Sequence, residues 1–150
     1  MVTYFYTNLQ DKTKIPVNCT EFYCSHINVT KLPELPKSLT HLQCYYNNLT
    51  ELPVLPKSLT HLHCCYNKLI ELPVLPNSLI ELVCHNNNLT SLPELPITLV
   101  ILDCSHNNIK YLSPNNCEVM KKCEWFEILN NPFSAIFTGN YDFKECLMNL

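Results

Sequence analysis

The stretch that decides the fold is SLTHLQCYYNNLTELPVLPK, residues 38–57. It recurs nearly intact as SLTHLHCCYNKLIELPVLPN from Ser58 and as SLIELVCHNNNLTSLPELPI from Ser78. A shorter copy, TLVILDCSHNNIKYLSP, begins at Thr98. The copies start twenty residues apart. Self-similarity at a fixed period of this length predicts a solenoid, in which each repeat packs only against its neighbours.

Each repeat divides into a short strand and an extended return. Leu42 and Cys44 alternate with His41, Gln43 and Tyr45, which is the period of two expected for a strand with one buried face. Later leucines come every three residues beside proline, which bars a helix interior and favours a polyproline-like path. The sequence therefore predicts an α/β-type repeat solenoid that is mostly β. Parallel strands lie on its concave side and extended segments on its convex side.

The repeat pattern, LxxLxLxxNxLxxLPxLPxx, resembles the leucine-rich repeat over at least residues 32–112. Its length and its LPxLP return are similar to the short repeats of secreted bacterial effectors and of amoeba-infecting giant viruses. The resemblance implies a scaffold that binds host proteins. Some of those effectors carry a ubiquitin-ligase domain after the repeats. The seventeen residues after Phe133 are too few to hold one, so we do not expect that activity of this sequence.

The whole chain, residues 1–150, is predicted to form one leucine-rich repeat domain. Residues 19–112 hold the regular repeats. Residues 1–18 are interpreted as a degenerate first repeat that caps the stack, or alternatively as a strand added antiparallel to its edge. Residues 113–150 are predicted to form a longer terminal repeat and a small helical cap, with a short helix over residues 113–123. End repeats need such cover because an open stack exposes core and a strand edge.

An asparagine recurs at one position of four successive repeats, where its amide can bond backbone groups of the neighbouring repeat, whereas the repeat before them has Ile27 at this position. This predicts a hydrogen-bonded ladder at Asn47, Asn67, Asn87 and Asn107. After a longer spacing of 24 residues, Asn131 takes the same position. Such an amide matters because an unsatisfied buried polar group costs about 1–3 kcal/mol.

Half of the ten cysteines occupy one inward position of the predicted strands. These are Cys24, Cys44, Cys64, Cys84 and Cys104. Buried cysteine behaves as a small hydrophobe, and this spacing lacks the paired C-x-x-C geometry of structural zinc sites. We therefore expect these thiols to fill the core. Near the cap, Cys117, Cys123 and Cys146 could pair or bind a metal. Cys65 follows an inward cysteine, which predicts an outward, accessible, reactive thiol.

The amino-acid composition of the chain argues against several classes of function. Hydrophobic residues are 47% and charged residues 15% of the chain, so it can bury a core. All ten basic residues are lysine and the net charge is −3, which argues against a nucleic-acid binder, since arginine usually holds phosphates. No apolar run approaches a membrane span, and no secretory signal is visible at the N-terminus. We expect a cytoplasmic protein with reduced cysteines.

The outward positions of the strands form four rows when the chain is counted by twenty residues. The first row contains Glu21, His41, His61, Glu81, Ile101 and Trp125. The second row contains Thr3, Tyr23, Gln43, His63, Val83, Asp103 and Glu127. The third row contains Phe5, Ser25, Tyr45, Cys65, His85, Ser105 and Leu129. The edge row contains Tyr6, His26, Tyr46, Tyr66, Asn86, His106 and Asn130. All six histidines fall on these rows and no lysine does.

These rows predict a non-enzymatic protein–protein interaction module that binds a partner on its concave face. Tyrosine, tryptophan and histidine supply rigid contact area with polar tips. Acidic residues without lysine favour a partner with a neutral or basic surface. We expect no cofactor. The predicted contact residues are Tyr23, His41, Gln43, Tyr45, Tyr46, His61, His63, Cys65, Tyr66, Glu81, His85, Asp103 and Trp125.

Other interpretations of the same rows stay open. His41, His61 and His63 lie close together, with Cys65 and His85 nearby, and such side chains bind zinc or copper. A flat sheet, however, spreads ligands about 5–7 Å apart without making them converge. A Cys–His enzyme would use Cys65, but nothing supplies an oxyanion hole. The histidines could also reflect drift in duplicated units. A purely structural, self-associating repeat protein is the remaining alternative.

Overall fold

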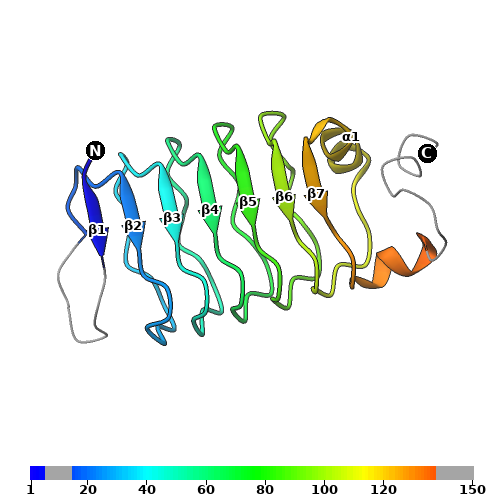
Figure 1. The fold of residues 1–150 in the computed structure, drawn as a ribbon, viewed down its shortest axis with the longest axis horizontal. Coiled ribbons are helices and arrows are strands. Elements are labelled where there is room, and N and C mark those ends of the chain that lie inside the picture. The colour runs from blue at the N-terminus through cyan, green and yellow to red at the C-terminus, as the bar shows by residue number, and fades with distance from the viewer. Residues whose placement is uncertain (6–14, 138–150) are drawn as a thin grey trace.

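The computed structural model describes residues 1–5 and 15–137 (Figure 1). Tyr6, Cys146 and the predicted cap beyond residue 137 lie outside this part of the chain. The strands are three residues each and form one parallel sheet in chain order. They are β1 (Thr3–Phe5), β2 (Glu21–Tyr23), β3 (His41–Gln43), β4 (His61–His63), β5 (Glu81–Val83), β6 (Ile101–Asp103) and β7 (Trp125–Glu127). Figure 1 shows the predicted solenoid, with a turn of chain behind each of β2 to β6.

The register of the first strand differs from the prediction. β1 pairs with β2 in parallel, so the antiparallel alternative is wrong. Thr3 lies beside Glu21 and Phe5 beside Tyr23, which shows that Thr3 belongs to the first row and Phe5 to the second. Counting by twenty residues misplaced both because Thr3 and Glu21 are 18 residues apart, whereas the regular repeats advance by twenty. Packing accounts for this register, since the Phe5 and Tyr23 rings stack with centroids 5.2 Å apart.

The core lies behind the sheet and is built from the same positions of each repeat. The middle residues of β3 to β6 are leucines with no exposed surface, and the five inward cysteines are equally buried, as predicted. Burial raises the pKa of Cys24 to about 12, and it raises the pKa of Cys44, Cys64 and Cys84 as well. A thiol that stays protonated at neutral pH packs as an apolar group. The five inward cysteines therefore pack in the core as small apolar side chains.

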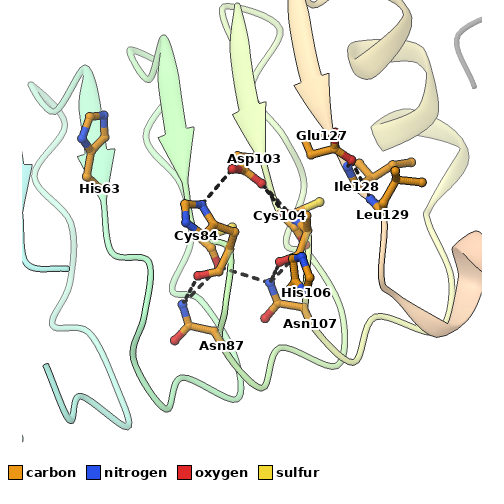
Figure 2. Close-up of polar contacts among 12 residues, drawn as sticks. His63, Cys84, Asn87, Asp103, Cys104, His106, Asn107, Glu127, Ile128 and Leu129 are labelled. Carbon is orange, nitrogen blue, oxygen red and sulfur yellow. Dashed lines mark hydrogen bonds and ion pairs between the residues drawn. The ribbon is translucent and has the colours of Figure 1, made fainter. Parts of the chain in front are cut away.

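The predicted asparagine ladder is confirmed. The Asn67 amide donates to the Cys44 carbonyl at 3.0 Å and to the Cys64 carbonyl at 3.1 Å, and its oxygen accepts from the Leu49 N–H at 2.9 Å. The same bonds recur at the equivalent asparagines, Asn47, Asn87, Asn107 and Asn131. Figure 2 shows the rungs at Asn87 and Asn107. Each amide thus satisfies buried backbone groups of two successive repeats.

A second ladder was not predicted. The hydroxyls that open each repeat donate to backbone carbonyls of the preceding repeat, as Ser58 Oγ does to Leu39 O at 2.6 Å and to Lys37 O at 2.7 Å. The equivalent residues are Ser38, Ser78 and Thr98. The signal was present in the sequence, because a hydroxyl residue stands at the start of each copy.

The predicted helix near the C-terminus is α1 (Pro114–Lys122). The side chain of Ser113 caps its N-terminus by accepting from the Asn116 N–H at 3.2 Å, and proline occupies the first turn, where no donor is needed. Asn116 is buried and joins the helix to the preceding repeat through the Leu95 N–H at 2.8 Å and the Pro93 carbonyl at 3.0 Å. A 3-10 helix, η1 (Pro132–Phe137), follows β7. No helix among the described residues is long and apolar enough to span a membrane.

Candidate functional site

The concave face consists of the outward side chains of β1 to β7 and of the turns that follow these strands. Apart from Cys65, all the predicted contact residues are at least partly exposed on this face. Tyr46, Tyr66 and Trp125 are the most exposed of them, at 45%, 39% and 49%. The register of the strands brings equivalent positions side by side, so the side chains of each row meet their neighbours across adjacent repeats.

The prediction of an accessible thiol at Cys65 is wrong. Its side chain is buried, with 8% of the residue exposed, and this burial raises the pKa of the thiol to about 11. The equivalent residues of the neighbouring repeats are the larger Tyr45 and His85, so a small side chain between them lies below the surface. Ser105, in the same row, is buried for the same reason. Cys65 therefore has neither the exposure nor the thiolate character of a reactive cysteine.

An aromatic strip follows the ends of β2 to β5. We define it as His26, Tyr45, Tyr46, Tyr66 and His85. The Tyr46 and Tyr66 rings stack at 4.1 Å with planes 7° apart, and the His26 and Tyr46 rings stack at 4.5 Å. His85 meets the Tyr66 ring edge-on at 5.1 Å, and Tyr45 meets His26 edge-on at 5.4 Å. The strip is a continuous, preordered surface of rings.

The backbone under this strip has an unusual conformation. His26, Tyr46, Tyr66 and His106 have left-handed φ values between 51° and 60°. That conformation is unfavourable for residues with a Cβ and is tolerated best by glycine and asparagine. The chain itself uses asparagine at the equivalent positions of two other repeats, Asn86 and Asn130. The rings are thus present at positions where the backbone favours a different residue, and retained strain of this kind is concentrated at functional sites.

A shallow recess lies on the face beside the N-terminal end of the strip. It has a volume of about 520 Å³ and is lined by Phe5, Tyr23, Ser25, Gln43 and Tyr45, together with His26 and Ile27. The Ser25 hydroxyl is buried there without a hydrogen-bond partner. Glu21 borders the same region, because its carboxylate accepts from the Thr3 hydroxyl at 2.8 Å and from the Tyr23 hydroxyl at 3.3 Å. Phe5 and Ser25 were not among the predicted contact residues, although both were placed on the outward rows of the strands.

The other half of the face pairs histidines with carboxylates. His63 Nε2 lies 2.8 Å from Glu81 Oε1, and His61 Nε2 lies 3.8 Å from Glu81 Oε2. His85 Nδ1 lies 2.8 Å from Asp103 Oδ2, an approach close enough for an ion pair but not aligned as a hydrogen bond. Figure 2 shows His63 on β4, Asp103 on β6 and Glu127 on β7, with His106 at the turn after β6.

His41 and His61 form a stacked pair with ring centroids 4.3 Å apart. Their Nδ1 atoms lie 2.9 Å from the hydroxyls of Thr40 and Thr60, respectively. Partial burial lowers the pKa of His61, the neighbouring His41 lowers it further, and Glu81 opposes both effects. Each imidazole of the pair is therefore held by the threonine of its own repeat. The lowered pKa means that His61 resists protonation.

Comparison with solved structures finds similar proteins of known architecture. YopM from Yersinia enterocolitica WA-314 is 34% identical over 79% of this chain and 26% of its own, with a TM-score of 0.72. A Shigella effector LRR domain is 37% identical over 75% of this chain and 48% of its own, with a TM-score of 0.65. The chain has the leucine-rich repeat fold. It spans about a quarter of the first relative and about half of the second. No family model and no curated protein sequence matches it.

Its solenoid of twenty-residue repeats is similar in fold to these solved structures. The likeness to giant-virus repeats stays a prediction. Metal binding finds no support in the geometry, because among the residues that the structure describes no three His, Cys, Asp or Glu side chains converge on one point. The stacked His41 and His61 rings illustrate why, since each imidazole faces its neighbour's ring instead of a common centre.

Proposed function

We propose that this protein is a non-enzymatic interaction module that binds a protein partner on its concave face, with the aromatic strip as the centre of the contact. The observation that carries the proposal is the left-handed backbone of Tyr46 and Tyr66. The fold alone does not require these rings, because the chain uses Asn86 at the same position. Tyrosines that are exposed, stacked and held in one geometry lose little entropy on binding, which is typical of interface hot spots.

The similarity to effector repeat domains supports the class of function, since the solenoid is a scaffold for extended binding surfaces. The charge of the face supports a partner with a neutral or basic surface. None of the seven strands contains lysine, while Glu21, Glu81, Asp103 and Glu127 carry carboxylates there. Complementary charge of this kind guides encounter and selects among partners.

The experiment exchanges the two central tyrosines for the residue that the chain itself uses at this position. The Tyr46→Asn/Tyr66→Asn double variant should lose capture of the partner in affinity purification from cell lysate, followed by mass spectrometry. Its melting temperature should shift by only a few degrees, because relief of backbone strain offsets about 0.5–1.5 kcal/mol of lost ring stacking.

The matched control is Tyr111→Ala, which removes an exposed tyrosine from the return segment of a repeat, away from the concave face. It should capture the same proteins as the wild type. Equal capture by the double variant would contradict a binding site at the aromatic strip. Loss of capture with the control would show that the contact lies elsewhere on the solenoid.

A further inference from the structure

All six histidines of this protein lie on the concave face. They share it with four carboxylates, and none of the strands contains lysine. The formal charge of the face is therefore −4 when every imidazole is neutral and +2 when every imidazole is protonated. Histidine ordinarily titrates near pH 6.5, whereas lysines and carboxylates elsewhere keep their charges between about pH 5.5 and 7.5. Protonation of imidazoles therefore makes the charge of this face less negative, while lysines and carboxylates elsewhere keep their charges.

Three of the histidines lie close to carboxylates of the face, and two of them lie beside Glu81. His63 Nε2 and Glu81 Oε1 are 2.8 Å apart, and His61 on the same strand approaches the second oxygen of Glu81 at 3.8 Å. On the other side of His63, its partner in register is the uncharged Gln43. A proton on His63 would consequently neutralise the charge that Glu81 presents to a partner.

The second pair has a comparable environment. His85 lies 2.8 Å from Asp103, and its other neighbour is the Tyr66 ring at 5.1 Å. Asp103 cannot easily turn away, because its other oxygen accepts from the backbone N–H and the hydroxyl of Ser105 at 3.1 and 2.7 Å. The next carboxylate in the row, Glu127, is held by two backbone N–H groups at 2.9 Å. The carboxylates therefore stay in place while the imidazoles change charge.

We propose that the concave face holds a basic segment of its partner near neutral pH and releases it in mild acid, when His63 and His85 become protonated. The inference rests on the proposed function and adds its regulation. Lysine or arginine side chains of the partner and the imidazolium groups compete for the same two carboxylates. Binding of one must weaken binding of the other, because linkage between two ligands of one site is reciprocal. The stacked His41–His61 pair adds to the effect at lower pH, since the pKa of His61 is lowered.

A synthetic peptide, acetyl-(Gly-Arg)₄-amide, serves as the probe, with calorimetric titration at pH 7.5 and 5.5 at one low ionic strength. An imidazole that titrates near pH 6.5 and must stay neutral weakens binding about ten-fold over this interval. The two histidines together should therefore raise the Kd by a factor of about 10 to 100. A constant Kd, or tighter binding at pH 5.5, would overturn the inference.

The deciding variant is His63→Gln/His85→Gln, because glutamine keeps a hydrogen-bond donor but takes up no proton. Its Kd should change by less than about three-fold between the two pH values. The matched control, His106→Gln, removes a histidine of the same face that lies outside the aromatic strip and forms no ion pair with any described residue. It should keep most of the pH dependence, and equal flattening in the deciding variant and in this control would contradict the role of the pairs. Circular dichroism at both pH values shows whether each variant is folded.

Failure of this inference and failure of the proposed function have different signatures. Absence of peptide binding at pH 7.5 overturns the inference but leaves the tyrosine-dependent capture intact. Capture that survives the Tyr46→Asn/Tyr66→Asn double variant contradicts the proposed function and leaves the peptide titration as a separate result.

Discussion

The inward and outward residues of the three-residue strand β4 have different roles. Leu62 points inward, is completely buried, and is a leucine again in β3, β5 and β6. Its neighbours His61 and His63 point outward and are replaced by other residues in the next strand, Glu81 and Val83. Close packing constrains the inward side in every repeat, because a core at crystal density tolerates few changes of volume. The outward side chains of β4 are not packed into the core, so they are free to differ and to carry a binding function.

The largest expected difference between the two sides comes from truncating one residue on each. Leu62→Ala should lower the free energy of unfolding by about 2–5 kcal/mol, because it leaves a cavity between two neighbouring repeats. His63→Ala should lower it by less than about 1 kcal/mol, since the pair with Glu81 is partly exposed. Urea denaturation followed by circular dichroism measures both values. Similar losses for the two variants would show that the outward side also holds the fold together.

A smaller effect is expected from two adjacent asparagines with different roles. Asn87→Leu removes a buried amide that bonds Cys64, Cys84 and Leu69, and should cost about 1–3 kcal/mol. Asn88 is exposed, so Asn88→Leu should change the stability by no more than about 0.5 kcal/mol. Thermal unfolding of both variants under one condition tests the ladder. Equal melting temperatures would contradict its contribution to stability.

The smallest effect concerns the pH dependence of stability at His61. Burial, with a further contribution from His41, lowers the pKa of His61 in the folded state below its ordinary value. The unfolded chain therefore binds the proton first as the pH falls through about 6.5, and stability decreases until the folded state is protonated as well. His61→Gln should lose less stability than the wild type between pH 7.5 and 5.5. Melting temperatures along this interval, with His106→Gln as the control, measure the difference, and parallel curves for wild type and His61→Gln would count against it.

Several parts of the structure could be predicted because they repeat. The leucine positions, the inward cysteines and Asn47 to Asn107 recur at a constant spacing, and a parallel stack converts that spacing into columns in space. The helix near the C-terminus was predictable from the extra residues between Asn107 and Asn131. The Ser38 to Thr98 ladder carried an equally regular signal and was overlooked.

Other features depended on contacts that a repeat pattern does not contain. Cys65 was expected outside, but its burial depends on the size of the residues beside it in two other repeats. Phe5 and Thr3 were placed in the wrong rows, because β1 pairs with β2 in a register of 18 residues instead of twenty. The predicted contact residues other than Cys65 were placed on one face correctly, but whether they bind a partner stays a prediction.

The sequence by itself determined the solenoid, since twenty-residue periodicity allows leucine, cysteine and asparagine to be buried only by stacking copies in register. The tertiary structure alone decided which outward residues meet. It stacked Tyr46 on Tyr66 in a left-handed backbone and brought His63 to Glu81 and His85 to Asp103. The physical reason is that periodicity specifies the face and the row on which a side chain lies. The side chains that it contacts depend instead on rotamers, ring planes and distances across strands.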